Sequence, residues 1–314
     1  MTASSDAILG EGLALPPRAQ EALGKTRPFY WSVRRELWEN RAIYLAPLIA
    51  AGVVLFGVCL GHLHLLHVQT RSAPDFQGMD GHGVRLGMPA IVPYLISAFA
   101  ILATSLIVGV FYCLAALNTE RRDRSVLFWK SLPVSDLTTV LSKAVVPVFV
   151  LPIVALAVIF ATHLAMLAID LVSAVVGGES AADVLARLPL GQLWLDLGYG
   201  ALLLGLWYAP VWGWLLLVSA WCKRMTFLWG VGPPLALCLI ERMAFGTAYA
   251  WALLQSRLAV GLAGAFSEPA RDHFSLPWPD PLPFLAHPGP WIGIAVAGVF
   301  LAGAVWLRRR REPI

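Results

Sequence analysis

The chain has 314 residues, of which 58% are hydrophobic and 13% are charged, and its formal net charge is +4. Soluble domains carry roughly 25% charged residues and about 45–50% apolar residues, so this composition excludes an ordinary water-soluble globule. The apolar residues also fall into long blocks, and runs of about 18 or more with few charges are typical of membrane spans. We therefore expect an all-α membrane protein.

The N-terminal segment, residues 1–42, is expected to lie in the cytoplasm and to end in an interfacial helix. Its first 27 residues contain no apolar stretch of the kind found in signal peptides, so we expect no cleaved leader. Residues 29–41 read FYWSVRRELWENR, with Trp31 and Trp38 among charged side chains. This pattern is typical of an amphipathic helix in the membrane interface, and the alternative is the exposed start of the first span.

Six apolar blocks follow, and together they form a transmembrane domain over residues 43–307. Each block is near the roughly 20 residues needed to cross about 30 Å of hydrocarbon. The expected spans are 43–66, 91–117, 144–169, 197–221, 226–246 and 290–307. Residues 248–266 are also apolar but contain Arg257, which indicates a re-entrant or surface-lying helix before the last span.

Lys and Arg residues are distributed unevenly among the connections. With the N-terminus in the cytoplasm, the cytoplasmic segments 1–42, 118–143, 222–227 and 308–314 hold 17 of the 23 basic residues. The positive-inside rule therefore predicts six spans with both termini in the cytoplasm, including the basic tail 308–314.

The cytoplasmic loop between the second and third spans, residues 118–143, reads NTERRDRSVLFWKSLPVSDLTTVLSK. Dense charges come first, and they are followed by apolar residues that need a partner surface or the membrane interface. Pro133 favours a turn, because the residue before a proline is pushed toward extended geometry. Ser135 can then cap a new helix that begins at residue 136 or 137. The sequence thus predicts a compact, rigid, charged and aromatic protrusion.

This loop, with a span on either side, resembles the ABC-2 type permease family, the membrane subunits of ATP-driven exporters. In that family a loop with an LP-V/I-S motif docks into a groove on a separate ATPase subunit. The resemblance extends to the interfacial helix, the six-span layout and the helical segment before the last span. The residues that it assigns to the ATPase-coupling loop are Glu120, Arg121, Arg122, Asp123, Arg124, Phe128, Trp129, Lys130, Pro133 and Ser135.

The resemblance implies an exporter subunit in the inner (cell) membrane of a bacterium. The subunit would pair with a second copy or with a related permease, and the ATPase would bind ATP and Mg. The three arginines of the loop, Arg121, Arg122 and Arg124, would pair with acidic residues of the ATPase, or would serve as ordinary positive-inside anchors.

The sequence contains no motif that predicts catalysis by this chain. It has no GxxxxGK[ST] phosphate-binding loop, no HExxH and no GxSxG. Its four cysteines lack CxxC spacing, so we expect neither a disulfide framework nor a zinc site. We expect a transporter subunit without its own ATPase activity, with no cofactor of its own and no nucleic-acid partner.

A histidine cluster supports the alternative function. His62, His64 and His67 form an HxHxxH pattern at the outer end of the first span. Imidazoles suit copper or zinc, so the alternative is a membrane-embedded metal-handling protein or enzyme. Because the first two residues diverge by about 200° on a helix, polar interfacial histidines explain the pattern better than a metal site does, and we assign no metal site.

Glu241 and Arg242 lie in the fifth apolar block and are a possible membrane-buried functional pair. Ionisable residues inside a span are costly and often functional. They are interpreted as an ion pair, as a substrate contact, or as the start of the segment 248–266 near the outer surface. The last interpretation fits best, since Arg257 follows in that segment.

Overall fold

A computed structural model describes residues 28–71, 91–122, 135–178, 180–266 and 288–310. Every regular element in these ranges is helical. In chain order the elements are α2 (Pro28–Glu39), α3 (Ala42–Arg71), α4 (Val92–Ala116), α5 (Asn118–Arg122), α7 (Asp136–Val145), η1 (Val146–Val150), α8 (Leu151–Val176), α9 (Ala181–Arg187), α10 (Leu190–Trp207), α11 (Ala209–Trp221), α12 (Thr226–Phe245), α13 (Tyr249–Phe266) and α15 (Pro288–Arg310).

Five helical stretches in the described residues are long and apolar enough to cross a membrane, and a bent pair makes a sixth. The five are Ala42–Gly61, Val92–Arg122, Asp136–Val176, Thr226–Phe245 and Pro288–Arg310. The bent pair joins Ala181–Trp207 to Ala209–Trp221 at an angle of 46°. The predicted all-α membrane fold is therefore confirmed, with five spans, or six if the bent pair that contains the expected fourth span crosses the membrane as one.

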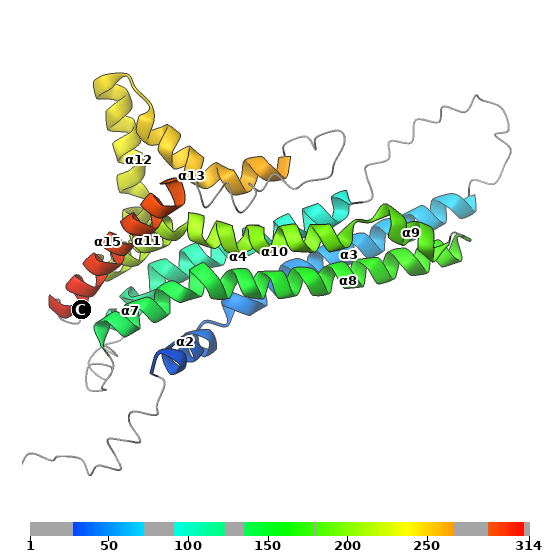
Figure 1. The fold of residues 1–314 in the computed structure, drawn as a ribbon, viewed down its shortest axis with the longest axis horizontal. Helices are drawn as coiled ribbons and strands as arrows, with labels where there is room; N and C mark the ends of the chain where they lie inside the picture. Colours follow the sequence, from blue (N-terminus) through cyan, green and yellow to red (C-terminus); the bar gives the residue numbers. More distant parts are fainter. Residues whose placement is uncertain (1–27, 72–90, 123–134, 179, 267–287, 311–314) are drawn as a thin grey trace, which may run out of the picture.

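Most of these helices form one elongated bundle. In Figure 1, α3, α4, α8 and α10 run side by side along its length, and their mutual contacts agree with this view. Helix α15 packs along α11 at the end where the chain terminates (Figure 1). Helix α12 leaves the bundle, and α13 folds back toward it (Figure 1).

The apolar segment before the last span is the helix α13, and it packs on the break between α10 and α11. Trp207 donates its indole N–H to the carbonyl of Arg257 at 3.2 Å, and the Tyr208 hydroxyl donates to the carbonyl of Leu258 at 3.0 Å. The Arg257 guanidinium lies 4.1 Å from the ring centroid of Trp207. The arginine that interrupts this segment is thus held by an aromatic ring and not placed in a seventh span.

The third span is longer than expected, because α7, η1 and α8 form one continuous helix from Asp136 to Val176. Ser135 caps its start, with the hydroxyl oxygen accepting a hydrogen bond from the Thr138 N–H at 3.1 Å. The prediction that Ser135 caps this helix is therefore confirmed. The π-helical turn η1 contains Pro147, which has no N–H to donate and so loosens the helix at this point.

Helix α10 approaches that π-turn unusually closely. At Gly205 a side chain would collide with the backbone carbonyl of Val148, whereas Gly198 on the same helix has open space around it. Only glycine fits at position 205, because it has no Cβ. This contact, with the buried rings of Trp212 and Tyr112 in the same core cluster as Val146, fixes α10 and α11 against the third span.

Candidate functional site

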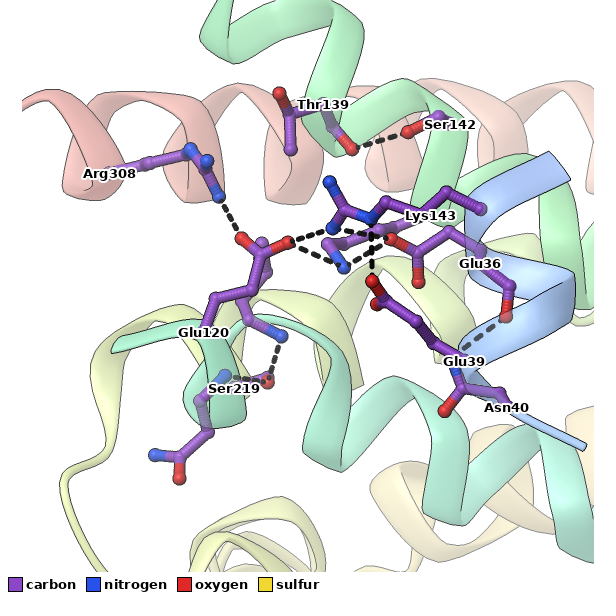
Figure 2. Close-up of polar contacts among 12 residues, drawn as sticks. Glu36, Glu39, Asn40, Glu120, Thr139, Ser142, Lys143, Ser219 and Arg308 are labelled. Carbon is purple, nitrogen blue, oxygen red and sulfur yellow. Dashed lines mark hydrogen bonds and ion pairs between the residues drawn. The ribbon is translucent and has the colours of Figure 1, made fainter. Parts of the chain in front are cut away.

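Charged side chains from four helices meet at one end of the bundle, as Figure 2 shows. We call this group the ion cluster, and we call the end of the bundle where it lies the charged end. Its members are Arg35 and Glu36 of α2, Glu120 of α5, Asp136 and Lys143 of α7, and Arg308 of α15.

Lys143 lies at the centre of the ion cluster. Its ammonium is 2.7 Å from the Glu36 carboxylate and 3.1 Å from the Glu120 carboxylate. The side chains of Lys143 and Glu36 are only 2% and 3% exposed. An isolated buried charge is costly, so each of these groups needs its partners to offset the cost of burial.

Glu120 is the carboxylate with the most cationic partners. One of its oxygens accepts from the Arg35 guanidinium at 2.9 Å, and the other accepts from Arg308 at 2.7 Å. Arg308 also donates through Nε to the Asp136 carboxylate at 2.9 Å. The two ends of the 118–143 loop, α5 and α7, are thus joined through the same arginine of the last helix.

Neutral groups complete the site. The Tyr112 hydroxyl donates to the second oxygen of Glu36 at 2.9 Å. Arg121 is buried and donates to the carbonyl of Ala220 at 2.6 Å. The Ser219 hydroxyl oxygen accepts the backbone N–H groups of Leu117 and of the following residue, both at 3.0 Å. These bonds hold the start of the loop on the end of α11.

The ion cluster has three carboxylates and three cations, and Glu39 adds an exposed carboxylate 3.0 Å from Arg35. Glu36, Glu120, Lys143 and Arg308 are almost wholly buried, whereas Arg35 and Asp136 are partly exposed. Buried charges are tolerated only where geometry and hydrogen bonding are good. No nucleophile or activated base is part of the arrangement. The ion cluster therefore has a structural role: its ion pairs fix the positions of α2, α5, α7 and α15 relative to one another.

The structure places the predicted loop residues in different settings. Glu120 and Arg121 are buried and bonded within the chain, so their side chains are not presented at the surface. Arg122 and Ser135 are exposed. The other predicted residues lie outside the described part of the chain, and they are Asp123, Arg124, Phe128, Trp129, Lys130 and Pro133.

Glu241 caps α13. Its carboxylate accepts the backbone N–H groups of Tyr249 at 2.7 Å and Ala250 at 2.6 Å, and the Thr247 hydroxyl at 2.7 Å. Gly246, with φ of 67°, closes α12 just before this turn. Arg242 is exposed, and no ion pair with Glu241 is found among the described residues. The contacts match the interpretation of Glu241 as the start of the segment 248–266.

The backbone at His62, His64 and His67 is part of α3, and the side chains of these residues lie outside the described part. Within the residues that the structure describes, no group of three or more His, Cys, Asp or Glu side chains is arranged to hold a metal ion. The metal site stays a hypothesis.

A second polar group lies inside the bundle, and sequence reasoning did not single it out. Trp194 donates its indole N–H to Nδ1 of His163 at 3.1 Å, so the imidazole proton sits on Nε2. That nitrogen lies 3.0 Å from the carbonyl of Tyr94, whose hydroxyl donates to Asp170 at 2.6 Å. The group ties α4, α8 and α10 together with its hydrogen bonds satisfied.

Sequence reasoning also missed Glu36, Lys143 and Arg308 as partners. Each of them lies at the boundary of an apolar block on the side predicted to be cytoplasmic. The sequence shows that these opposite charges lie at a similar depth in the membrane. It does not show which helices are adjacent, so the pairs could not be predicted.

The fold and the site define a multi-pass helical membrane protein whose charged end is braced by buried ion pairs. No family model matches the chain, and no curated protein or solved structure is similar to it.

Proposed function

We propose that the chain is the membrane subunit of an ABC-2 type exporter, which moves a substrate across the inner membrane with energy from a separate ATPase subunit. The observation that carries the proposal is the ion cluster. It fastens both flanks of the 118–143 loop to the first and last helices of the described chain.

The ion cluster would give the loop a stiff base. A loop that receives a push from an ATPase has to sit on a stiff base, since a compliant base would absorb the movement. Glu120 precedes the central part of the loop and Asp136 follows it, and both bind Arg308. A load on residues 123–134 would therefore reach α4, α8 and α15 together.

The contact with the ATPase is assigned to the central part of the loop, residues 123–134. Phe128 and Trp129 are large apolar residues in a segment predicted to be cytoplasmic, and such residues call for a partner surface. Arg122 is exposed and precedes this segment in the chain, so it supplies a further charge for the contact. Glu120 and Arg121 are buried, so we assign them to the support of the loop and not to the contact.

The exposed surface of α12 supports a two-subunit assembly, either a homodimer or a pair with a related permease. This helix is long enough to span the membrane, yet Gly230 is its one residue classed as buried. Large side chains such as Phe245 and Met243 are 77% and 87% exposed. A helix so little covered by its own chain has a face available for a second subunit as well as for lipid.

The experiment is purification of the tagged chain from its native membrane, followed by an ATPase assay of what accompanies it. We expect an ATP-hydrolysing subunit that is lost in Trp129→Ala. Trp251→Ala is the matched control, because Trp251 is a half-exposed tryptophan on α13. A chain that purifies alone, or an ATPase retained equally by both variants, contradicts the proposal.

A further inference from the structure

The face of α2 opposite Glu36 carries an arginine between two tryptophans. The Arg34 guanidinium carbon lies 5.1 Å from the Trp31 ring centroid and 4.7 Å from the Trp38 ring centroid. The two tryptophans are 55% and 68% exposed. Aromatic rings this close to a guanidinium attract it through their electron-rich faces and limit its motion.

This face lies opposite the buried carboxylate that α2 gives to the ion cluster. At about 100° per residue, Trp31, Arg34 and Trp38 lie roughly 140–160° around the helix axis from Glu36, while Arg35 lies between the two sides. Arg35 is paired with three carboxylates of the chain, whereas Arg34 has no carboxylate within ion-pair distance among the described residues. Its charge is therefore available to an external anion.

The location of this face matches a membrane surface. Helix α2 ends at Glu39, and α3, whose apolar stretch crosses the membrane, begins at Ala42. The same end of the bundle bears a second exposed Arg–Trp pair on α15, where the Arg310 guanidinium carbon lies 4.5 Å from the ring centroid of Trp306. Tryptophan and arginine at this depth are typical of the headgroup region.

The charged end is also basic on its surface. The turn between α11 and α12 lies there too, because Asn118 donates to the carbonyl of Cys222 at 2.6 Å. The exposed basic residues of this end are Arg41, Arg122, Lys223, Arg224, Arg309 and Arg310. A positive surface of this kind attracts anionic lipids.

We propose that Arg34, Trp31 and Trp38 bind the phosphate headgroup of an anionic phospholipid. The guanidinium fork matches phosphate oxygens in bidentate geometry. The tryptophans supply apolar faces and indole N–H donors at the level of the glycerol and headgroup. A lipid fits better than free phosphate, because the exposed tryptophan faces need the apolar part of the same molecule.

The site has a structural consequence that does not depend on the proposed exporter function. Helix α2 is held on one face by Glu36 in the ion cluster, and the lipid holds the opposite face. Anionic lipid should therefore stabilise the docking of α2 on α7, and with it the folded chain.

The test uses the full chain in nanodiscs of phosphatidylcholine with a rising fraction of phosphatidylglycerol, and it measures the thermal unfolding midpoint at each composition. We expect the midpoint to rise with phosphatidylglycerol. In Arg34→Gln clearly more than about fivefold more anionic lipid is needed for the same rise, because the variant loses its bidentate phosphate contact in addition to the roughly fivefold effect of one basic residue at a membrane surface.

Arg309→Gln is the matched control, since it removes an exposed positive charge from the same end without an adjacent tryptophan pair. Trp38→Leu gives a second variant, and we expect it to weaken the lipid response while leaving the charge unchanged. Glycerol 3-phosphate added to phosphatidylcholine nanodiscs should not reproduce the rise. The proposal is overturned if phosphatidylglycerol has no effect, if Arg309→Gln shifts the response as much as Arg34→Gln, or if glycerol 3-phosphate suffices.

Discussion

Lys143 shows most clearly how the charged end is held together. Its side chain is 2% exposed, and its ammonium contacts the carboxylates of Glu36 and Glu120, which come from two other helices. Removing one partner of a buried ion pair leaves the other charge buried without a partner. This costs more stability than replacing the whole pair with apolar residues.

We predict that Lys143→Met destabilises the protein by about 3–5 kcal/mol, because two carboxylates lose a buried partner. The measurement is thermal or denaturant unfolding of the purified chain in detergent. Lys223→Met is the control, since Lys223 is exposed at the same end and should change stability by less than about 0.5 kcal/mol. Equal effects of the two substitutions would show that the ion cluster contributes nothing special.

A double-mutant cycle tests the pairing itself. Glu36→Gln and Lys143→Met each break the 2.7 Å contact, so the double mutant should cost less than the sum of the single mutants. We expect a coupling energy of about 1–3 kcal/mol from the same unfolding measurement. Strict additivity would mean that the two residues do not stabilise each other.

At the scale of elements, the contact between α10 and the π-turn η1 depends on one glycine. A Cβ at position 205 would collide with the carbonyl of Val148, and that carbonyl belongs to the backbone and cannot rotate away. The close approach is what positions the break at Tyr208, on which α13 packs.

We therefore predict that Gly205→Ala destabilises the chain by about 1–3 kcal/mol through overpacking. Gly198→Ala, on the same helix with open space around it, should be neutral or stabilising by up to about 1 kcal/mol, because alanine favours helix. The comparison needs only the unfolding midpoints of the two variants in one detergent. A harmless Gly205→Ala would refute the close packing of α10 on η1.

The elements were largely predictable, and the contacts between them were not. Hydropathy located the membrane helices, although the third one begins at Asp136 and not at 144. Ser135 correctly marked the start of α7. The break at Tyr208 was missed because hydropathy carries no information on bending, and the available signal was Pro210 in the first turn of α11. The pairing of Arg308 with Glu120 was missed because it joins positions 188 residues apart in the chain.

At the scale of the whole molecule, the ion cluster brings the first described helix and the last one to the same end of the bundle. Positive charge concentrates there, and the positive-inside rule assigns that end to the cytoplasm. We predict that a green fluorescent protein fused to the C-terminus is fluorescent and that alkaline phosphatase fused there is inactive. An active phosphatase fusion would show that the C-terminus lies outside the cytoplasm and would contradict this orientation.

The proposed function requires that the 118–143 loop contacts an ATPase subunit. The most direct measurement is photo-crosslinking in intact native membranes, with a photoreactive amino acid in place of Trp129 and, as control, in place of Trp251. We predict a covalent adduct between position 129 and an ATP-binding subunit, and no such adduct from position 251. Absence of the adduct at position 129, in a chain that is inserted at normal levels, would contradict the account.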